Sequence, residues 1–185
     1  MNAPAPGIVV RDAGERDVPR IAAIYAHHVR TGLATFEVEP PGAAEMARRH
    51  ASVLGWALPF FVAEDAGGIL GYAYAAPYRT RAGYRYTVED SIYVDPGAVG
   101  RGVGRGLLER LIDACTGIGC RQMIAVIGDT GNRPSIALHE ACGFARVGTL
   151  PSTGFKFGRW VDSVLMQRAL GAGDRSPPGG GGARF

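Results

Sequence analysis

A glycine-rich turn in the middle of the chain carries the clearest chemical signal. Residues 92–108 read IYVDPGAVGRGVGRGLL, which predicts a strand, a glycine-rich turn and the first turn of a helix. A helix N-terminus has unpaired N–H groups and about half a positive charge, and glycines let an anion approach them without meeting a Cβ. This segment therefore predicts a phosphate-binding site made of backbone.

Two nucleotide-binding patterns fit this turn poorly. A phosphate-binding P-loop ends in Gly-Lys-Ser or Gly-Lys-Thr, whereas Gly104 and Gly106 are followed by Arg105 and Leu107. A dinucleotide fingerprint needs G-x-G-x-x-G directly after the strand, but the spacing here is G-x-G-x-G-x-G after a five-residue connection. The pattern that remains is Arg101-x-x-Gly104-x-Gly106.

A second pattern follows about 30 residues later. Residues 132–144 read NRPSIALHEACGF, in which Pro134 suits a first helical turn and Gly143 a helix end. Together the two segments resemble the signature of the GCN5-related N-acetyltransferases, the GNAT superfamily: R/Q-x-x-G-x-G/A, then N-x-x-[A/S]-x-x-x-[Y/H]-x-x-x-G-F. The resemblance covers roughly residues 8–170. It implies a GNAT-type acyl-CoA N-acyltransferase fold and acetyl-CoA as co-substrate.

The resemblance also assigns residues to the cofactor. In this family the pantetheine arm pairs with the strand before the turn, and the amides of the turn hold the pyrophosphate. The positions implied here are Ile92, Tyr93, Val94, Gly100, Arg101, Gly102, Val103, Gly104, Arg105, Gly106, Asn132 and Ser135. The side chain of Arg101 or Arg105 either meets phosphate charge or is solvated. Asn132 fits a contact to the cofactor arm and a helix N-cap equally well.

Acetyl transfer to an amine also needs a base and an acid. Glu89 stands directly before the predicted cofactor strand, in the string YTVEDSIYV. That string resembles the T-V-E-x-S-V-Y-V segment of the phosphinothricin and methionine sulfoximine N-acetyltransferases, in which the glutamate is taken to be the base, through water. A surface ion pair is the alternative. His139 occupies the position that many relatives fill with tyrosine as general acid; a packed, hydrogen-bonded histidine is the alternative.

Substrate selection is implied by further matches to the same branch. Residues 78–85 read YRTRAGYR and resemble its substrate-binding arginine segment. An arginine fork suits a carboxylate, so Arg79 or Arg81 is expected to select an amino acid over a simple amine. The substrate-binding candidates are Phe36, Arg79, Thr80, Arg81, Glu89, Asp90, Ser91, Lys156 and Trp160. Surface charge is the alternative for each arginine, and core packing for Phe36 and Trp160. Members of the branch are homodimers with active sites near the subunit interface.

Composition limits the other classes of function. The chain has 185 residues, 46% hydrophobic and 20% charged, which predicts one globular domain. A net charge of +3 with scattered arginines argues against nucleic acid as a partner. The apolar stretches are too short to span a bilayer and the N-terminus carries no signal pattern, so we expect a cytoplasmic protein with no membrane partner. Three cysteines without a C-x-x-C pair predict buried thiols, with neither a disulfide nor a metal site.

Periodicity and turn residues predict the elements that position these groups. The predicted strands are 8–11, 60–63, 69–75, 90–94, 122–127, 145–148 and 160–168, and the predicted helices 18–30, 43–54, 107–117 and 136–142. We expect an α/β (α+β) fold over residues 8–170, with a mixed, mainly antiparallel sheet covered by helices on both faces. Residues 1–7 are expected to be a flexible N-terminus, and the Gly/Pro-rich residues 171–185 a disordered tail.

These observations predict an N-acetyltransferase that moves the acetyl group of acetyl-CoA to the α-amino group of a small amino acid analogue. Phosphinothricin, methionine sulfoximine and methionine sulfone are the expected types, which connects the enzyme to antibiotic or herbicide resistance. A polyamine, aminoglycoside or protein terminus would favour an acidic pocket, whereas Arg79, Arg81 and Arg85 favour an anionic acceptor. A non-catalytic acyl-CoA sensor is the other alternative, and it would need neither Glu89 nor His139.

Overall fold

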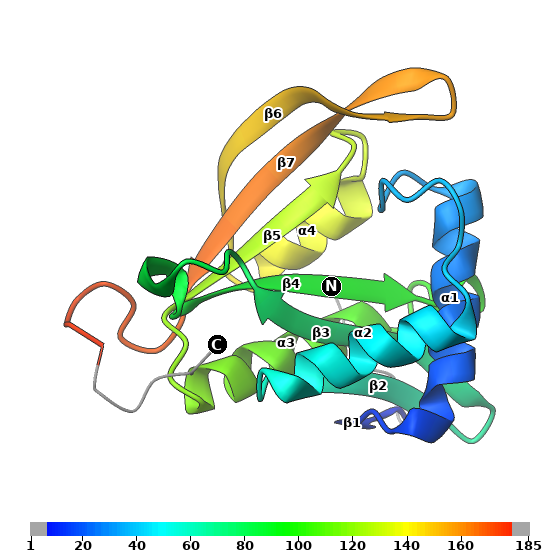
Figure 1. Ribbon diagram of the computed structural model, residues 1–185, viewed down its shortest axis with the longest axis horizontal. Helices are drawn as coiled ribbons and strands as arrows, with labels where there is room; N and C mark the ends of the chain where they lie inside the picture. Colours follow the sequence, from blue (N-terminus) through cyan, green and yellow to red (C-terminus); the bar gives the residue numbers. More distant parts are fainter. Residues whose placement is uncertain (1–6, 179–185) are drawn as a thin grey trace.

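In the computed structural model, which describes residues 7–178, seven strands form one sheet with helices on both faces (Figure 1). The strands are β1 (Val9–Asp12), β2 (Phe60–Asp65), β3 (Gly68–Pro77), β4 (Thr87–Val94), β5 (Gln122–Gly128), β6 (Ala145–Lys156) and β7 (Arg159–Ala169). The helices are α1 (Val18–Thr31), α2 (Ala43–Gly55), α3 (Val103–Gly117) and α4 (Arg133–Ala141), with short 3-10 turns η1 (Glu15–Asp17), η2 (Ala82–Tyr84) and η3 (Pro96–Ala98).

The strand order is β1-β2-β3-β4-β5-β7-β6. Every neighbouring pair is antiparallel except β4 and β5, which run parallel. The predicted mixed, mainly antiparallel sheet is therefore confirmed.

The parallel pair opens the sheet at its centre. Pairing of β4 with β5 extends only from Thr87 and Gln122 to Asp90 and Ala125, and the two strands then diverge (Figure 1). The N–H of Asp95 donates to Leu70 O at 2.8 Å, toward β3. Because backbone groups alternate along a strand, Ile92 and Val94 direct their N–H and C=O groups to the opposite side, into the gap that β5 has left.

Helices cover both faces of the sheet. On one face Tyr25 of α1 packs edge-on against Tyr93 of β4, with ring centroids 5.0 Å apart. On the other face α3 approaches so closely that a Cβ at Gly71 would lie 3.1 Å from a methyl group of Val103. This arrangement confirms the predicted layers and places the N-terminus of α3 beside the gap.

Strand β6 is longer than the predicted 145–148. It continues to Lys156, with register shifts between Arg146 and Gly148 and between Leu150 and Gly154. The sequence does not indicate this extension, because Pro151 and Gly154 both disfavour strands. The structure accommodates Pro151 because β6 is an edge strand and the register shift removes the need for its missing N–H.

Residues that follow the predicted domain boundary at 170 contact the domain. Residues 171–175 form a turn, and Arg121 donates to the carbonyl oxygens of Gly173 and Ser176, each at 2.7 Å. These contacts tie Gly173 and Ser176 to Arg121, which precedes β5. The rest of the predicted tail, 179–185, and residues 1–6 of the predicted flexible N-terminus lie outside the described residues. No helix in residues 7–178 is both long and apolar enough to cross a membrane.

Candidate active site

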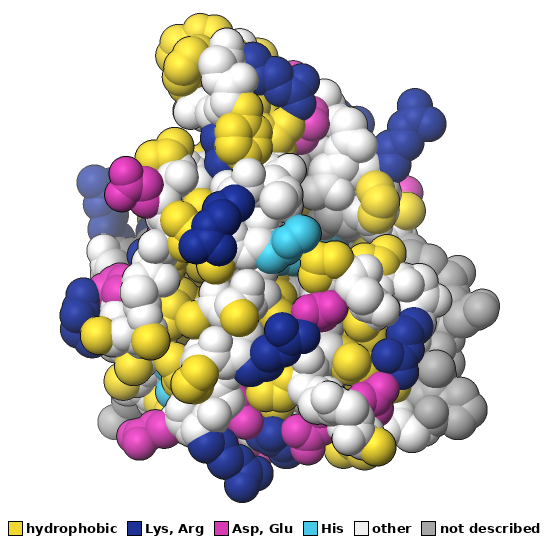
Figure 2. Space-filling model, turned by 90° about the vertical axis from the view of Figure 1, so that its right-hand side faces the viewer, with side chains coloured by type: hydrophobic (Ala, Val, Ile, Leu, Met, Phe, Trp, Pro, Cys, Tyr) yellow, Lys and Arg dark blue, Asp and Glu magenta, His cyan; other side chains and the backbone are white. Residues whose placement is uncertain are grey.

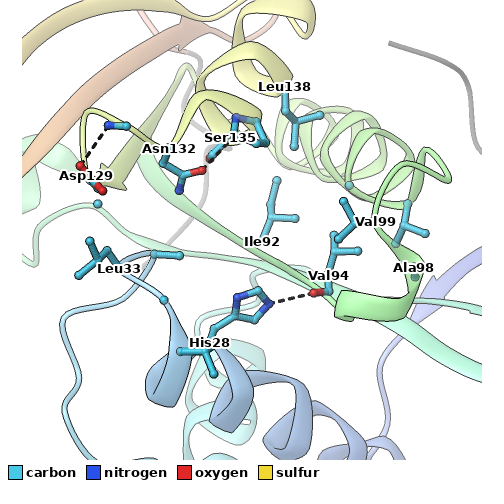
Figure 3. Close-up of a pocket in the computed structure, with 18 of the residues that line it drawn as sticks. His28, Leu33, Ile92, Val94, Ala98, Val99, Asp129, Asn132, Ser135 and Leu138 are labelled. Atoms are coloured by element: carbon cyan, nitrogen blue, oxygen red, sulfur yellow. Dashed lines mark hydrogen bonds between the residues drawn. The ribbon is translucent and has the colours of Figure 1, made fainter. Parts of the chain in front are cut away.

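A cavity of about 750 Å³ lies where β4 and β5 diverge. It is bordered by β4, by the starts of α3 and α4 and by the loop after α1. Figure 3 shows Ile92 and Val94 from β4 projecting toward Leu138 of α4, with His28 of α1 below them. His28 Nε2 lies 2.8 Å from Val94 O, which can only accept, so this nitrogen carries the proton. Burial lowers the pKa of His28 and so favours the neutral ring.

The glycine-rich turn ends at the N-terminus of α3, which faces this cavity. Gly102 is the N-cap residue with φ of 78°, a left-handed conformation that favours glycine. The N–H of Gly106 donates to Gly102 O at 3.0 Å, so the amides of Val103 and Gly104 precede the first intrahelical bond. Both residues line the cavity, as Gly100 and Gly102 do. The backbone anion site predicted from the sequence has the geometry to bind a phosphate.

The two arginines of the turn lie differently. Arg101 donates to Oδ2 of Asp65, the last residue of β2, at 2.7 Å and does not line the cavity. Arg105 lines the cavity and also bonds Glu109 Oε1 at 2.7 Å. Arg105 is thus the arginine of the turn whose side chain borders the cavity.

Asn132 caps α4 and lines the cavity at the same time. Its Oδ1 accepts from the N–H of Ser135 at 3.3 Å, as Figure 3 shows, which confirms the N-cap interpretation. The cap fixes Asn132 and Ser135 side by side at the start of α4, where both border the cavity.

A smaller cavity of about 200 Å³ adjoins the first. Glu89, Asp90 and Ser91 of β4 line it, together with Phe36 and His139. Five residues line both cavities and so mark the place where the two adjoin, called the passage below: Ala34, Ile92, Gly128, Asn132 and Ser135. The divergence of β4 from β5 therefore creates two compartments that meet at the sheet.

Glu89 has the properties of a base. Burial, with a smaller contribution from the charge of neighbouring Asp90, raises the pKa of the Glu89 carboxyl above its ordinary value. A raised pKa makes a carboxylate a better proton acceptor. Successive β4 side chains alternate, so Glu89 and Asp90 point to opposite faces of the sheet.

Asp90 and His139 form a buried pair with side chains 2% and 5% exposed. His139 Nδ1 lies 2.7 Å from Ser135 O and Nε2 lies 3.0 Å from Asp90 Oδ2, so both ring nitrogens face acceptors. Burial lowers the pKa of His139, but the hydrogen bond and charge of Asp90 outweigh this effect and raise it overall. The second oxygen of Asp90, Oδ1, is buried without a hydrogen-bond partner among the described residues.

The other substrate candidates lie outside both cavities. Arg79, Thr80 and Arg81 are exposed between β3 and β4, where Arg79 lies over the rings of Tyr78 and Tyr84. Trp160 is exposed and packs against Phe155, and Lys156 is buried with its Nζ on backbone carbonyls. Among the described residues, no cluster of three or more His, Cys, Asp or Glu side chains is placed to hold a metal ion.

Sequence reasoning missed several lining residues. His28 lies three residues after Tyr25 on the buried stripe of α1, so a polar residue on an apolar face was the available signal. Leu33 and Ala34, from the loop after α1, and Asp129, Phe157 and Arg159 also line the large cavity. All of these lie in loops or turns except Arg159, the first residue of β7, and only the fold brings them to the gap.

Known proteins resemble this chain closely. Residues 21–144 match the acetyltransferase (GNAT) family. The chain is 57% identical over 169 residues to the phosphinothricin N-acetyltransferase of Alcaligenes faecalis, covering 91% of this chain and 86% of that protein. It is 40% identical to the L-methionine sulfoximine/L-methionine sulfone acetyltransferase of Pseudomonas aeruginosa, covering 87% and 94%. The crystal structure of a phosphinothricin acetyltransferase from Sinorhizobium meliloti in complex with acetyl-CoA superposes with a TM-score of 0.90 at 48% identity, covering 95% of both chains.

Proposed function

This chain belongs to the acetyltransferase (GNAT) family and is an acetyl-CoA-dependent N-acetyltransferase, and we propose that its acceptor is the α-amino group of a phosphinothricin- or methionine sulfoximine-type amino acid. One observation carries this proposal. The small cavity, which Glu89 lines, adjoins the large cavity, which the N-terminus of α3 faces. The two adjoin where β4 and β5 diverge.

The large cavity suits acetyl-CoA, which supplies the acetyl group as a thioester. The amides of Val103 and Gly104 would hold the pyrophosphate, with Arg105 as a charged neighbour. The backbone of Ile92 and Val94 offers donors and acceptors to the amides of the pantetheine arm. Val94 O already accepts from His28, so the remaining groups are its N–H and the two backbone groups of Ile92.

Glu89 is the proposed base. An amino acid enters as an ammonium ion and must lose a proton before its nitrogen can attack. The carboxylate of Glu89 accepts that proton, directly or through a water molecule. Its raised pKa makes the ionised carboxylate a better proton acceptor.

His139 is the proposed acid for the departing thiolate. The hydrogen bond and the charge of Asp90 favour the protonated ring, which borders the small cavity. Both ring N–H groups are already donated, to Ser135 O and Asp90, so one of these hydrogen bonds must break when the proton leaves.

The arginine segment is the proposed selector of the acceptor carboxylate. Ala76 of β3 pairs with Glu89 of β4, so residues 78–86 connect the two strands at the end of β4 that carries the base. Tyr78 and Tyr84 flank the guanidinium of Arg79, at 5.2 and 5.8 Å from the ring centroids. These contacts hold the guanidinium beside the two rings, and its N–H groups that do not bond Tyr78 would meet the carboxylate.

Two further features of the proposal concern the enzyme as a whole. Resemblance to the phosphinothricin and methionine sulfoximine branch supports a homodimer that works in the cytoplasm. Acetylation of phosphinothricin by such an enzyme would underlie resistance to this compound.

Thiol release from acetyl-CoA tests the function directly. The panel comprises phosphinothricin, methionine sulfoximine, methionine sulfone, ordinary amino acids and a polyamine. We expect release with the sulfoximine, sulfone and phosphinate compounds, and a KM increase corresponding to about 1.5–3 kcal/mol when the acceptor carboxylate is removed. Preference for the polyamine, or equal rates with the decarboxylated amine, would contradict the proposed acceptor.

A further inference from the structure

The only lysine of the chain is buried at the end of β6, and every other Lys/Arg position is arginine. Lys156 is 2% exposed, and its Nζ donates to Gly32 O at 2.9 Å and to Thr35 O at 2.8 Å. A compact ammonium can direct separate N–H bonds to two carbonyls, whereas the planar fork of arginine suits a bidentate anion. Lysine therefore suits this pair of acceptors better than arginine does.

Two glycines let the segment of residues 32–36, which contains Gly32 and Thr35, lie against β5 and β6. A Cβ at Gly128 of β5 would lie 2.1 Å from Leu33 O, and a Cβ at Gly154 of β6 would lie 2.1 Å from Phe36 Cε1. Neither glycine has a positive φ, so close approach, rather than backbone conformation, requires glycine here. Residues 32–36 are thus pressed onto β5 and β6 where Lys156 holds them.

A contact from α1 fixes the other side of the segment. The hydroxyl of Tyr25 lies 2.8 Å from Thr35 Oγ1 and also donates to Glu37 Oε1 at 2.8 Å. Residues 32–36 therefore connect the half of the sheet under α1 with the half formed by β5, β7 and β6. They do so beyond Asp90 and Ala125, where pairing between β4 and β5 has ended.

The segment also forms one wall of both cavities. Leu33 and Ala34 line the large cavity, and Ala34 and Phe36 line the small one. Figure 3 shows Leu33 at the edge of the large cavity, on the loop that follows α1. The position of this loop sets the distance from Ala34 to Ile92 and Asn132, which also border the passage.

We propose that Lys156 is a positioning residue for acetyl transfer, which fixes residues 32–36 so that Ala34 sets the width of the passage between the two cavities and Phe36 the wall of the small one. This inference rests on the proposed function, because the passage is where acceptor and thioester must meet. Lys156 itself touches neither compartment. Its effect is indirect, and misplacing reacting groups by about 1 Å costs about 10²-fold in rate.

Lys156→Met tests the role, because methionine keeps the unbranched stem and removes the N–H donors. We expect kcat with a methionine sulfoximine acceptor to fall by about 10²-fold. Affinity for coenzyme A, measured by calorimetric titration, should fall much less than kcat, because the amides of α3 that hold the pyrophosphate are untouched. A merely structural role would lower the melting temperature and leave kcat of the remaining folded enzyme unchanged, which would overturn the inference.

Gly128→Ala disturbs the same segment with Lys156 intact, since the new Cβ displaces the carbonyl of Leu33. We expect the same fall in kcat, with a smaller loss of coenzyme A affinity because Gly128 and Leu33 also border the large cavity. Gly148→Ala in β6 is the matched control, because its Cβ meets nothing within 4 Å, and it should behave as wild type. Wild-type kcat in Gly128→Ala would count against the inference.

The single lysine offers a third measurement, which does not depend on activity. Reductive methylation of native protein, followed by mass spectrometry of the peptide containing residue 156, should show this amine protected compared with unfolded protein. Gly128→Ala should methylate faster than wild type. Equal rates for native and unfolded wild type would overturn the inference. If wild type releases no thiol with any acceptor, the proposed function is wrong. If wild type is active and Lys156→Met is equally active, only the inference about Lys156 is wrong.

Discussion

Glu89 is the residue on which the proposed chemistry depends. Glu89→Gln keeps the shape and removes the basicity, so kcat should fall by roughly 10²–10⁴-fold, the usual contribution of a positioned base. The pKa of Glu89 is raised, so kcat/KM of the wild type should rise with pH through that pKa, and the variant should lack this step. Steady-state thiol release across pH measures both effects. The variant should recover part of its rate at alkaline pH, where solution supplies neutral amine.

Two observations check this assignment. Glu39→Gln, at an exposed carboxyl that borders neither cavity, is the matched control and should keep wild-type activity. Glu89→Gln should also unfold at a higher temperature than wild type at neutral pH, because the raised pKa means that the ionised carboxylate costs stability. This difference should vanish below pH ~4.3, where the unfolded chain is protonated too. Near wild-type turnover in Glu89→Gln at neutral pH would make Glu89 a structural residue.

The buried pair of Asp90 and His139 contributes stability that depends on pH. His139→Phe keeps an aromatic ring against Phe144 but leaves the Asp90 carboxylate unpaired, so the free energy of unfolding should fall by about 3–5 kcal/mol. The pKa of His139 is raised on folding. Its contribution is therefore fully present below pH ~6.5 and is lost as pH rises through the folded pKa. Urea unfolding at several pH values measures this loss.

Asp90→Asn provides the comparison for that prediction. The amide still offers an oxygen to His139 and carries no buried charge, so this variant should be less destabilised than His139→Phe. It should also lack the wild-type loss of stability toward alkaline pH. Equal stability of His139→Phe and wild type would show that the pair does not hold α4 against β4.

At the scale of elements, the start of α3 decides cofactor affinity. A Cβ at Gly104 would lie 3.2 Å from Leu138 Cδ2 and 3.5 Å from Val94 Cγ2, between side chains that line the large cavity. Gly104→Ala should therefore weaken coenzyme A binding, while its better helix propensity compensates part of the crowding. A valine at this position would collide with α4, so that a loss of coenzyme A affinity could not be separated from a loss of stability. Calorimetric titration gives the affinity.

Gly117→Ala is the matched control within the same helix. Its Cβ meets nothing within 4 Å, and it lies at the far end of α3. We expect unchanged coenzyme A affinity there. An unchanged affinity in folded Gly104→Ala as well would contradict the assignment of the turn to the pyrophosphate.

Local sequence identified most of these elements, and the exceptions have physical causes. The turn at 100–106 and the cap at Asn132 were predictable because capping and phosphate binding depend on neighbouring residues. The extension of β6 through Pro151 was not, since the edge position that tolerates it exists only in the folded sheet. Lys156 was expected at the substrate, but its partners lie more than 120 residues away in sequence. No local pattern could place its Nζ on Gly32 and Thr35.

At the scale of the whole molecule, the outer edge of the sheet is strongly apolar. Phe155 and Trp160 are 57% and 65% exposed with ring centroids 5.3 Å apart, and Val147 and Leu150 of β6 are exposed as well. In Figure 2 apolar side chains gather at the top of the molecule, where the β6–β7 hairpin projects. Apolar patches of this kind mark protein interfaces, and an edge strand also offers unpaired backbone groups. This surface fits the proposed homodimer.

Phe155→Asp tests that assembly. If β6 and β7 form the interface, a buried, unpaired carboxylate there should convert the dimer to a monomer, as measured by sedimentation velocity at micromolar concentration. The melting temperature of the variant should fall only by the contribution of the lost interface, because the side chain of Phe155 is exposed in a single chain. Val9→Asp is the matched control, since Val9 is also 57% exposed on an edge strand, β1, at the opposite side of the sheet. It should remain dimeric. A wild-type monomer, or a monomer from Val9→Asp with a dimer from Phe155→Asp, would remove β6 from the interface and leave its aromatic surface for another partner.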